Sequence, residues 1–410
     1  MVIPFQRNFV ILQKKYSLLH MLRKVKIENY KSVVNQTFEL GRFNVVIGAN
    51  GCGKSNLLEA IAMAGLSSSG ALLPEMFENR GIRLSDNRFM RSAFEDVDKE
   101  FISVKVETSD GDESVYRIHY NAEQKPAQWE DVVEEETKIL LSTIQENGSQ
   151  FKVKDFKNFV EKMSKKLDED NTLNVNLFEK DNHSLVLARS RVNGLKNFTI
   201  YSLEETELRS LDQMPSTKLG RTGKGLLPYL KDLSKTEDGI NILNEVKENL
   251  MVIDWFEDLE MPESVLSQDS TLKLKDRYVD ESLDFFDQRS ANEAFLYLLF
   301  YFTLFISDET PSFFAIDNIE SSLNPKLCKL VVSKLAELAE KHNKQVILTT
   351  HSPFVLDGLD ELSETKRLLV VSRNSDGYTV VNQIKSDKSR SIPLSEAWLK
   401  GYIGGLPNNF

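Results

Sequence analysis

Cysteine and histidine are scarce in this 410-residue chain, and each scarcity excludes a class of site. The two cysteines, Cys52 and Cys328, form no pair at metal-ligand spacing and imply no disulfide framework. The five histidines form no such pair either; they are His20, His119, His183, His342 and His351. A reduced compartment suits this cysteine usage best, and we expect the protein to be cytoplasmic.

The chain also has no apolar run long enough for a membrane. Its most apolar stretch, residues 295–306, has about a dozen residues, whereas a bilayer-spanning helix needs about 20. Residues 9–12 are apolar but no small-residue cleavage site follows, so we expect neither a membrane anchor nor a signal peptide. Residues 1–20 are either a genuine extension or a consequence of start-codon choice, because Met21 directly precedes a strand-like segment.

Positive charge is in deficit. The chain has 51 Lys and Arg residues against 62 Asp and Glu residues, a formal net charge of −11. We therefore do not expect a protein that coats nucleic acid through its overall charge, although a dimer could still concentrate Lys and Arg on one face. A composition of 41% hydrophobic and 28% charged residues is typical of a globular, soluble protein, here of roughly two to three domains.

Hydrophobic patterning divides the chain into three regions, 1–110, 111–279 and 280–410. In and just beyond the first we expect strands at 22–30, 38–40 and 44–47, a helix from Lys54, and a hairpin over 101–119. In the last we expect helices at 294–306, 325–342 and near Pro353, strands at 313–316 and 346–349, and a hairpin over 367–381. The middle region is rich in charge and helix-like without sustained heptads or internal repeats, which predicts a compact, mainly helical insertion.

The strongest motif lies between the buried strand and the helix of the first region. Residues 48–55 read Gly-Ala-Asn-Gly-Cys-Gly-Lys-Ser and fit G-x-x-x-x-G-K-S completely. The glycines let backbone N–H groups wrap a phosphate, and the following helix adds its positive N-terminal end. We expect Lys54 to contact the β- and γ-phosphates of ATP and Ser55 to bind Mg²⁺. The predicted nucleotide-binding residues of this segment are Gly48, Asn50, Gly51, Cys52, Gly53, Lys54, Ser55 and Asn56.

A second half of the site follows much later in the chain. Asp317 ends an apolar strand, where a carboxylate that supports Mg²⁺ is needed. His351 ends the next strand and is placed to reach a γ-phosphate. Lys54 and Asp317 lie 263 positions apart, whereas a compact phosphate-loop domain has about 150 residues. An insertion must therefore separate two lobes of one head.

Four segments together resemble the ABC-type ATPase heads of the RecF, SMC and OLD group. They are residues 27–33 (Ile-Glu-Asn-Tyr-Lys-Ser-Val), the phosphate loop, residues 315–325 and residues 349–353 (Thr-Thr-His-Ser-Pro). The resemblance covers roughly 1–110 and 280–410, and it implies an α/β head with a mixed sheet and flanking helices. It also implies that two heads sandwich two ATP molecules, each ATP touching the signature segment of the other head. OLD-type proteins carry a TOPRIM nuclease domain after the head; only residues 352–410 follow His351, so we expect none here.

The signature segment of the resembled family should precede the apolar helix before Asp317. Ser290 matches its serine, but the glycine that should follow is absent and Glu293 adds a negative charge. The same residues also read as a helix cap, with Ser290 at N-cap and Glu293 at N3 of a capping box. Both interpretations can hold together.

The catalytic glutamate of the resembled family should follow the Mg²⁺-binding aspartate directly. Asn318 stands there instead, and an amide can orient water but cannot take a proton at neutral pH. Glu320 is close and could substitute by a different approach. No glutamine can be assigned to the Mg²⁺-sensing loop. The site residues predicted for catalysis are therefore Asp317, Asn318, Glu320 and His351, with slow hydrolysis expected.

Two other segments favour structural roles. Residues 295–300 are expected to be core, because an apolar run of this length is normally buried. Residues 219–226, rich in glycine and basic side chains, lack a preceding strand and are interpreted as a loop.

Three functions fit this sequence. The first is a nucleotide-gated switch, a slow ATPase that dimerises or assembles further around ATP and controls a separate nuclease or toxin, as ATPase subunits of bacterial anti-phage modules do. The second is a DNA-repair ATPase that binds duplex directly, which a steep salt dependence of binding would reveal. The third is an ATP-binding scaffold that does not hydrolyse, for which Asn318 is the argument.

Overall fold

The structure is a computed structural model that describes most of the chain. The described residues are 21–97, 100–123, 128–132, 176–180, 184–188, 194–210, 218–261, 271–280, 285–359, 361–386 and 392–406. Residues 1–20 lie outside them. Contacts group the chain into two units: unit 1 is Met1–Glu39, Ala60–Glu78 and Arg83–Lys196, and unit 2 is Leu40–Glu59, Asn79–Ile82 and Asn197–Phe410.

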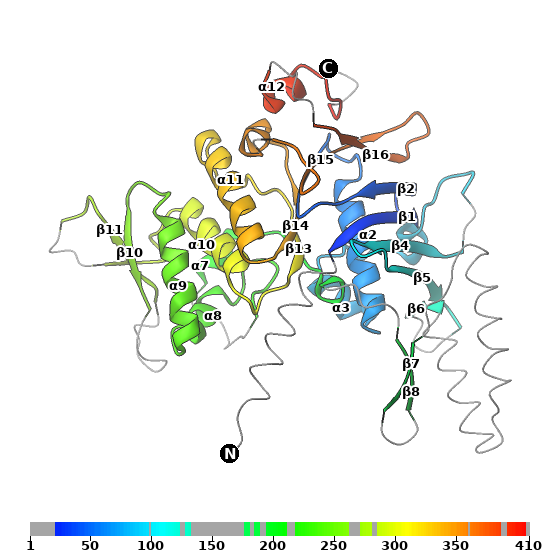
Figure 1. Ribbon diagram of the computed structural model, residues 1–410, viewed down its shortest axis with the longest axis horizontal. Coiled ribbons are helices and arrows are strands. Elements are labelled where there is room, and N and C mark those ends of the chain that lie inside the picture. Colours follow the sequence, from blue (N-terminus) through cyan, green and yellow to red (C-terminus); the bar gives the residue numbers. More distant parts are fainter. Residues whose placement is uncertain are drawn as a thin grey trace. The chain divides into compact units, whose positions relative to one another are not determined.

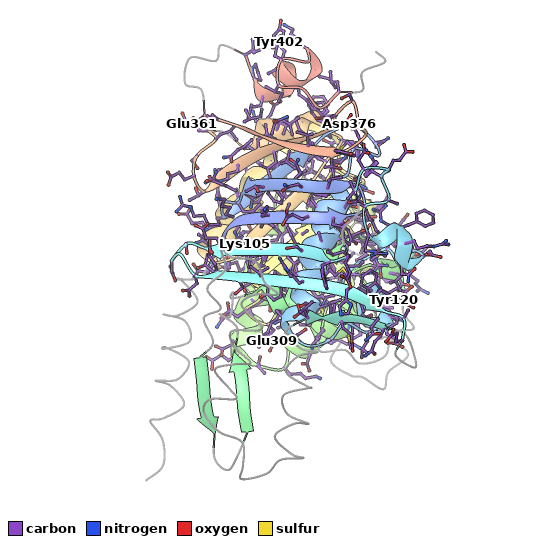
Figure 2. The ribbon with its side chains drawn as sticks, turned by 90° about the vertical axis from the view of Figure 1, so that its right-hand side faces the viewer. Lys105, Tyr120, Glu309, Glu361, Asp376 and Tyr402 are labelled. Carbon is purple, nitrogen blue, oxygen red and sulfur yellow. The ribbon has the colours of Figure 1, made fainter. Side chains whose placement is uncertain are left out.

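Unit 1 contains an antiparallel sheet in the order β2-β1-β4-β5-β6 (Figure 1). Its strands are β1 (Leu22–Tyr30), β2 (Val33–Glu39), β4 (Ile102–Thr108), β5 (Glu113–Asn121) and β6 (Gln128–Asp131). Along β4 every second residue is buried, so one face of the sheet packs inward and the other carries polar side chains. Figure 2 shows the neighbouring strands β4 and β5, which carry the labelled Lys105 and Tyr120.

Unit 2 contains a six-stranded sheet in the order β16-β15-β3-β14-β13-β9. Its strands are β3 (Phe43–Ile47), β9 (Ile200–Tyr201), β13 (Phe313–Ile316), β14 (Gln345–Thr349), β15 (Lys366–Arg373) and β16 (Thr379–Ile384). All neighbours pair in parallel except β16, which runs antiparallel to β15. The carboxyl ends of β3, β13 and β14 therefore meet at one edge of the sheet, where ligands of open α/β sheets bind.

The strands β3, β13, β14 and β15 share one buried apolar cluster with α10 (Glu293–Ile306), α11 (Pro325–Lys341) and the 3-10 helix η3 (Pro353–Gly358). The helix α2 (Lys54–Ser68) follows β3 and has residues in both units. In α10 every residue from Phe295 to Ile306 is buried, which confirms that this apolar run is core rather than a membrane segment or an exposed groove. Among the described helices, none combines the length and the apolar character that crossing a bilayer requires.

The expected elements of the first and last regions are confirmed with small shifts at their ends. The described part of residues 111–279 contains strands as well as helices. The helices are α7 (Glu205–Arg209), α8 (Leu226–Leu233) and α9 (Glu237–Leu250); the strands beyond β5, β6 and β9 are β7 (Asn176–Lys180), β8 (Ser184–Ala188), β10 (Phe256–Glu260) and β11 (Lys273–Asp276). Sequence patterning missed β10 because three of its five residues are acidic. The boundaries at 110 and 279 stay a prediction.

Candidate functional site

The phosphate loop connects β3 to α2 and needs its glycines. Gly48, Gly51 and Gly53 all adopt positive φ, at 153°, 74° and 111°. A Cβ added at Gly48 would come within 2.1 Å of the Val371 carbonyl oxygen. The loop therefore depends on residues without side chains, both for its conformation and for its closeness to β15.

The hairpin of β15 and β16 holds the outside of the phosphate loop. The Thr379 hydroxyl donates to the Cys52 carbonyl at 2.9 Å, and Arg373 Nε donates to the Gly51 carbonyl at 3.0 Å. Two loop carbonyls are thereby engaged by side chains of the hairpin. This arrangement suits a loop that presents N–H groups to an anion, because its acceptors are occupied elsewhere.

Lys54 is almost fully buried at the start of α2, with 6% of its surface exposed. Its ammonium group donates to the carbonyls of Gly48 at 2.8 Å and Ala49 at 3.2 Å. Burial lowers the pKa of Lys54, while the neighbouring Cys52, Asp317 and Glu320 oppose that shift. Asp317 and Glu320 thus lie close enough to act on Lys54 electrostatically, which joins the two halves of the site predicted from sequence.

Asp317 is held at the carboxyl end of β13. Its N–H donates to the Tyr201 carbonyl at 2.8 Å, and its Oδ1 accepts a short hydrogen bond from the Thr349 hydroxyl. A hydroxyl at Ser55 and a carboxylate at Asp317 are the hard oxygen ligands that Mg²⁺ takes alongside nucleotide phosphates. The residues present therefore fit the expected cation.

Asn318 turns the chain sharply after Asp317. Its φ of 57° is in the left-handed region, which asparagine tolerates better than most residues. Its N–H donates to the Thr349 hydroxyl oxygen at 3.0 Å. The turn brings Glu320 back toward the strand ends. Glu320 therefore approaches the site from a different direction than a glutamate at position 318 would.

Glu320 is the carboxylate that reaches the His351 loop. Its Oε1 accepts from the His351 backbone N–H at 2.8 Å. Its Oε2 is buried, and no described residue hydrogen-bonds to it. A carboxylate oxygen buried without a donor is costly, and this atom keeps acceptor capacity that the described residues do not use.

The His351 side chain lies on the same electrostatic network. Burial lowers the pKa of its imidazole, and the positive charge of Lys54 lowers it further, while Glu320 and Asp317 oppose the shift. His351 is therefore neutral at pH 7. A neutral imidazole can donate one hydrogen bond to a phosphate without adding charge.

Ser290 lies apart from these residues in the contacts of the described chain. Its N–H donates to the Asp287 carbonyl at 3.0 Å, and no described hydrogen bond or ion pair links it to the phosphate loop or to Asp317. The capping-box interpretation of Ser290 is wrong. The N-cap of α10 is Asn292, whose side chain accepts from the Phe295 N–H, because this asparagine sits directly before the first helical residue.

The glycine-rich basic segment 219–226 is a loop that ends at α8. The Arg221 carbonyl accepts from the Ser202 N–H at 2.9 Å, and the Thr222 carbonyl accepts from the Glu204 N–H at 2.9 Å. These bonds tie the segment to the chain after β9, which agrees with a structural role.

Sequence patterning missed three side chains of the site: Thr349, Arg373 and Thr379. Thr349 belongs to the segment Thr-Thr-His-Ser-Pro, whose pattern predicts a role for the histidine only. The other two lie in a hairpin more than 300 positions after the phosphate loop, and no local signal connects them to it.

The phosphate loop, the strand that ends in Asp317 and the His351 loop all lie within one matched family domain. A family model described as "AAA domain, putative AbiEii toxin, Type IV TA system" matches residues 43–357. The chain belongs to this family. The match spans both halves of the site of this AAA-domain ATPase, together with the segment between them.

Solved structures show what fold the ATPase has. An SMC head bound to the C-winged helix domain of ScpA aligns over 91% of this chain and 100% of its own, with 14% identity and a TM-score of 0.54. SMC heads from Thermotoga maritima and Pyrococcus furiosus align with 12% and 13% identity, TM-scores of 0.44 and 0.47, over 89% and 93% of this chain and 99% of each of theirs. No curated protein matches at a significant level.

The first of these similarities shows that the ATPase shares the SMC head fold. Together with the family match, it confirms the predicted P-loop ATPase head of ABC type, related to RecF and SMC. Nucleotide binding follows from the family, and the geometry above gives the residues that fit it.

Proposed function

We propose that this ATPase binds Mg²⁺-ATP, closes head to head with a second copy, hydrolyses ATP slowly and thereby controls a separate effector protein. Lys54 binds the β- and γ-phosphates, and Ser55 with Asp317 holds Mg²⁺. Gly48, Asn50, Gly51, Cys52, Gly53 and Asn56 complete the phosphate cradle. Ser290 faces the nucleotide of the partner head. The protein acts in the cytoplasm.

The observation that carries this proposal is the convergence of four side chains at one sheet edge. Asp317 and Glu320 both act electrostatically on Lys54 and on His351. These residues come from three separate segments, the phosphate loop, the turn after β13 and the loop after β14. A cation, two carboxylates and a neutral imidazole are the groups that orient a triphosphate and the water that attacks it.

Glu320 is the carboxylate we propose as the base. Water attacks the γ-phosphorus, the bond between the γ-phosphorus and the bridging oxygen breaks, and ADP leaves with that oxygen. A carboxylate oxygen of Glu320 takes the proton of the attacking water. The buried Oε2 has the free acceptor capacity for this role. Asn318, at the usual position of the base, orients water without taking its proton.

A separate nuclease or toxin is the effector we propose, in bacterial anti-phage defence. The family description names a toxin and a toxin–antitoxin system, which supports a role beside such an effector. An SMC head of this fold is bound to a winged helix domain of another protein, so heads of this fold accept protein partners. The net charge of −11 favours a protein partner over direct binding of duplex DNA.

The first test is nucleotide binding by the Lys54→Ala variant. Loss of a charged donor to phosphate should weaken ATP binding about a hundredfold with the fold intact. Titration with a fluorescent ATP analogue measures this affinity, and circular dichroism checks the fold. Lys224→Ala, in the loop that we interpret as structural, is the matched control and should bind like wild type. An unchanged affinity of Lys54→Ala for the ATP analogue would contradict the assignment of the phosphate loop.

A scaffold that binds ATP without hydrolysing it is the second candidate, and Asn318 favours it. The two candidates differ in one measurement, the steady-state release of phosphate. Any turnover that Lys54→Ala abolishes supports a slow ATPase, whereas ATP binding without turnover supports the scaffold.

A further inference from the structure

One buried hydroxyl, that of Thr349 at the end of β14, binds the turn that follows β13. Thr349 is 0% exposed. Its hydroxyl donates to Asp317 Oδ1 and accepts from the Asn318 N–H at 3.0 Å. Its carbonyl accepts from the Ile319 N–H at 3.1 Å. Three consecutive residues of the turn are thereby held by a single residue of the neighbouring strand.

The parallel register places this hydroxyl beside the carboxylate. Ile316 pairs with Leu348, so Asp317 and Thr349 are the next positions along the two strands. A hydroxyl has one hydrogen to donate, and here Asp317 receives it. The bond fixes one oxygen of the carboxylate, and no described residue hydrogen-bonds to the other, Oδ2. A fixed carboxylate with one available oxygen is preorganised to bind a cation.

The threonine also fixes the direction of the chain toward Glu320. Asn318 is left-handed, a conformation that costs most residues roughly 1–2 kcal/mol. Its N–H would lack this acceptor without the Thr349 hydroxyl. The hydroxyl is buried and bonded on both sides, so it is held in place before any ligand binds.

We propose that Thr349 is a positioning residue for Mg²⁺, acting through Asp317. The inference rests on the proposed function, in which Asp317 binds the cation of Mg²⁺-ATP. This role differs from supporting the fold. The hydroxyl raises the affinity for Mg²⁺ and does not change the affinity for nucleotide measured without Mg²⁺.

Two variants isolate the hydroxyl. Thr349→Ser and Thr349→Ala both lose the methyl group, and they differ from each other only in the hydroxyl. Thr303→Val is the control for removing a buried hydroxyl elsewhere in unit 2, because that hydroxyl only bonds the Leu299 carbonyl within α10. Circular dichroism and thermal unfolding establish that each full-length variant is folded.

The readout is the Mg²⁺ concentration needed for half-maximal binding of a fluorescent ATP analogue, with a parallel titration in EDTA. Thr349→Ala should need at least about tenfold more Mg²⁺, as for other residues that support metal ligands, while its affinity in EDTA stays within about twofold of wild type. Thr349→Ser and Thr303→Val should follow wild type in both titrations.

Three outcomes would overturn the inference. They are a Thr349→Ala variant with the Mg²⁺ dependence of wild type, a Thr349→Ser variant as defective as Thr349→Ala, and equal losses with and without Mg²⁺. Wild-type protein that binds no nucleotide in either titration would instead overturn the proposed function. The two failures are therefore distinguishable.

Discussion

At the residue scale, the turn after β13 decides which carboxylate reaches the loop of His351. Because Asn318 is left-handed, the chain reverses, and Glu320 accepts from the His351 N–H at 2.8 Å. A carboxylate directly after Asp317, where the resemblance predicts the catalytic glutamate, would instead extend from the left-handed position itself. The turn thus moves the candidate base from position 318 to Glu320.

This exchange predicts opposite effects of two substitutions on ATP turnover. Glu320→Gln should lower steady-state turnover by about 10² to 10⁴, the range of general-base help, with ATP binding intact. Asn318→Glu should change turnover little, since glutamate at a left-handed position costs roughly 1–2 kcal/mol. Asn318→Gly is the control that keeps the backbone conformation. A rise of tenfold or more in Asn318→Glu, with Glu320→Gln unchanged, would return the base to position 318.

The second prediction at this scale concerns the charge of His351 without nucleotide. Burial and Lys54 lower its pKa, so its imidazole should titrate below the ordinary value of about 6.5. As pH falls through that lowered pKa the ring gains a positive charge beside Lys54; above it the ring is neutral. NMR titration of the ring protons, assigned by their loss in His351→Gln, measures the midpoint. A midpoint at or above 6.5 would contradict this electrostatic picture.

The sequence contains some of these residue-scale features and not others. Lys54, Asp317 and His351 lie in segments whose local pattern shows a strand end or a glycine-rich loop, so their place could be predicted. The approach of Glu320 could not, because it depends on the φ of one asparagine. The role of Thr349 depends on strand register, which only the folded sheet defines.

At the element scale, parallel pairing explains why distant segments form one site. β3 pairs with both β14 and β15, so the phosphate loop follows the central strand of three. The positions of β3, β13 and β14 were predictable because these strands are short, apolar and bounded by turns. The strand β10, which follows α9, was not, since three of its five residues are acidic.

The entry to α10 gives a prediction at this scale. Asn292 caps the helix, which leaves Ser290 exposed on the preceding turn and able to meet another molecule. In the proposed dimer Ser290 acts on the nucleotide of the partner head. Equal amounts of Lys54→Ala and Ser290→Arg protein should then regain about a quarter of wild-type turnover, because half of the dimers carry one intact site of two.

Each variant alone should show almost no turnover, because both of its composite sites are damaged. The control is a mixture of Lys224→Ala and Ser290→Arg. In it, both the Lys224→Ala homodimers and the mixed dimers should turn over ATP. A mixture of Lys54→Ala and Ser290→Arg that stays as inactive as its components would show that the two residues do not complete one site across a dimer.

At the scale of the whole molecule, the chain is an ATPase head whose activity we propose to depend on a second copy. The family match covers residues 43–357, which include every residue that we propose to contact the nucleotide or Mg²⁺. Slow hydrolysis suits a switch that remains closed until it is triggered. In this proposal the effector binds a surface that forms only in the dimer, so it is bound only while ATP is present.

The most direct test of this account is the mass of the Glu320→Gln protein in solution, measured by light scattering with and without Mg²⁺-ATP. The account predicts one chain without nucleotide and at least two chains with it, and no such change for the Lys54→Ala, Glu320→Gln double variant. The same mass with and without Mg²⁺-ATP, in protein shown to bind the nucleotide, would contradict the proposal that ATP closes two heads on each other.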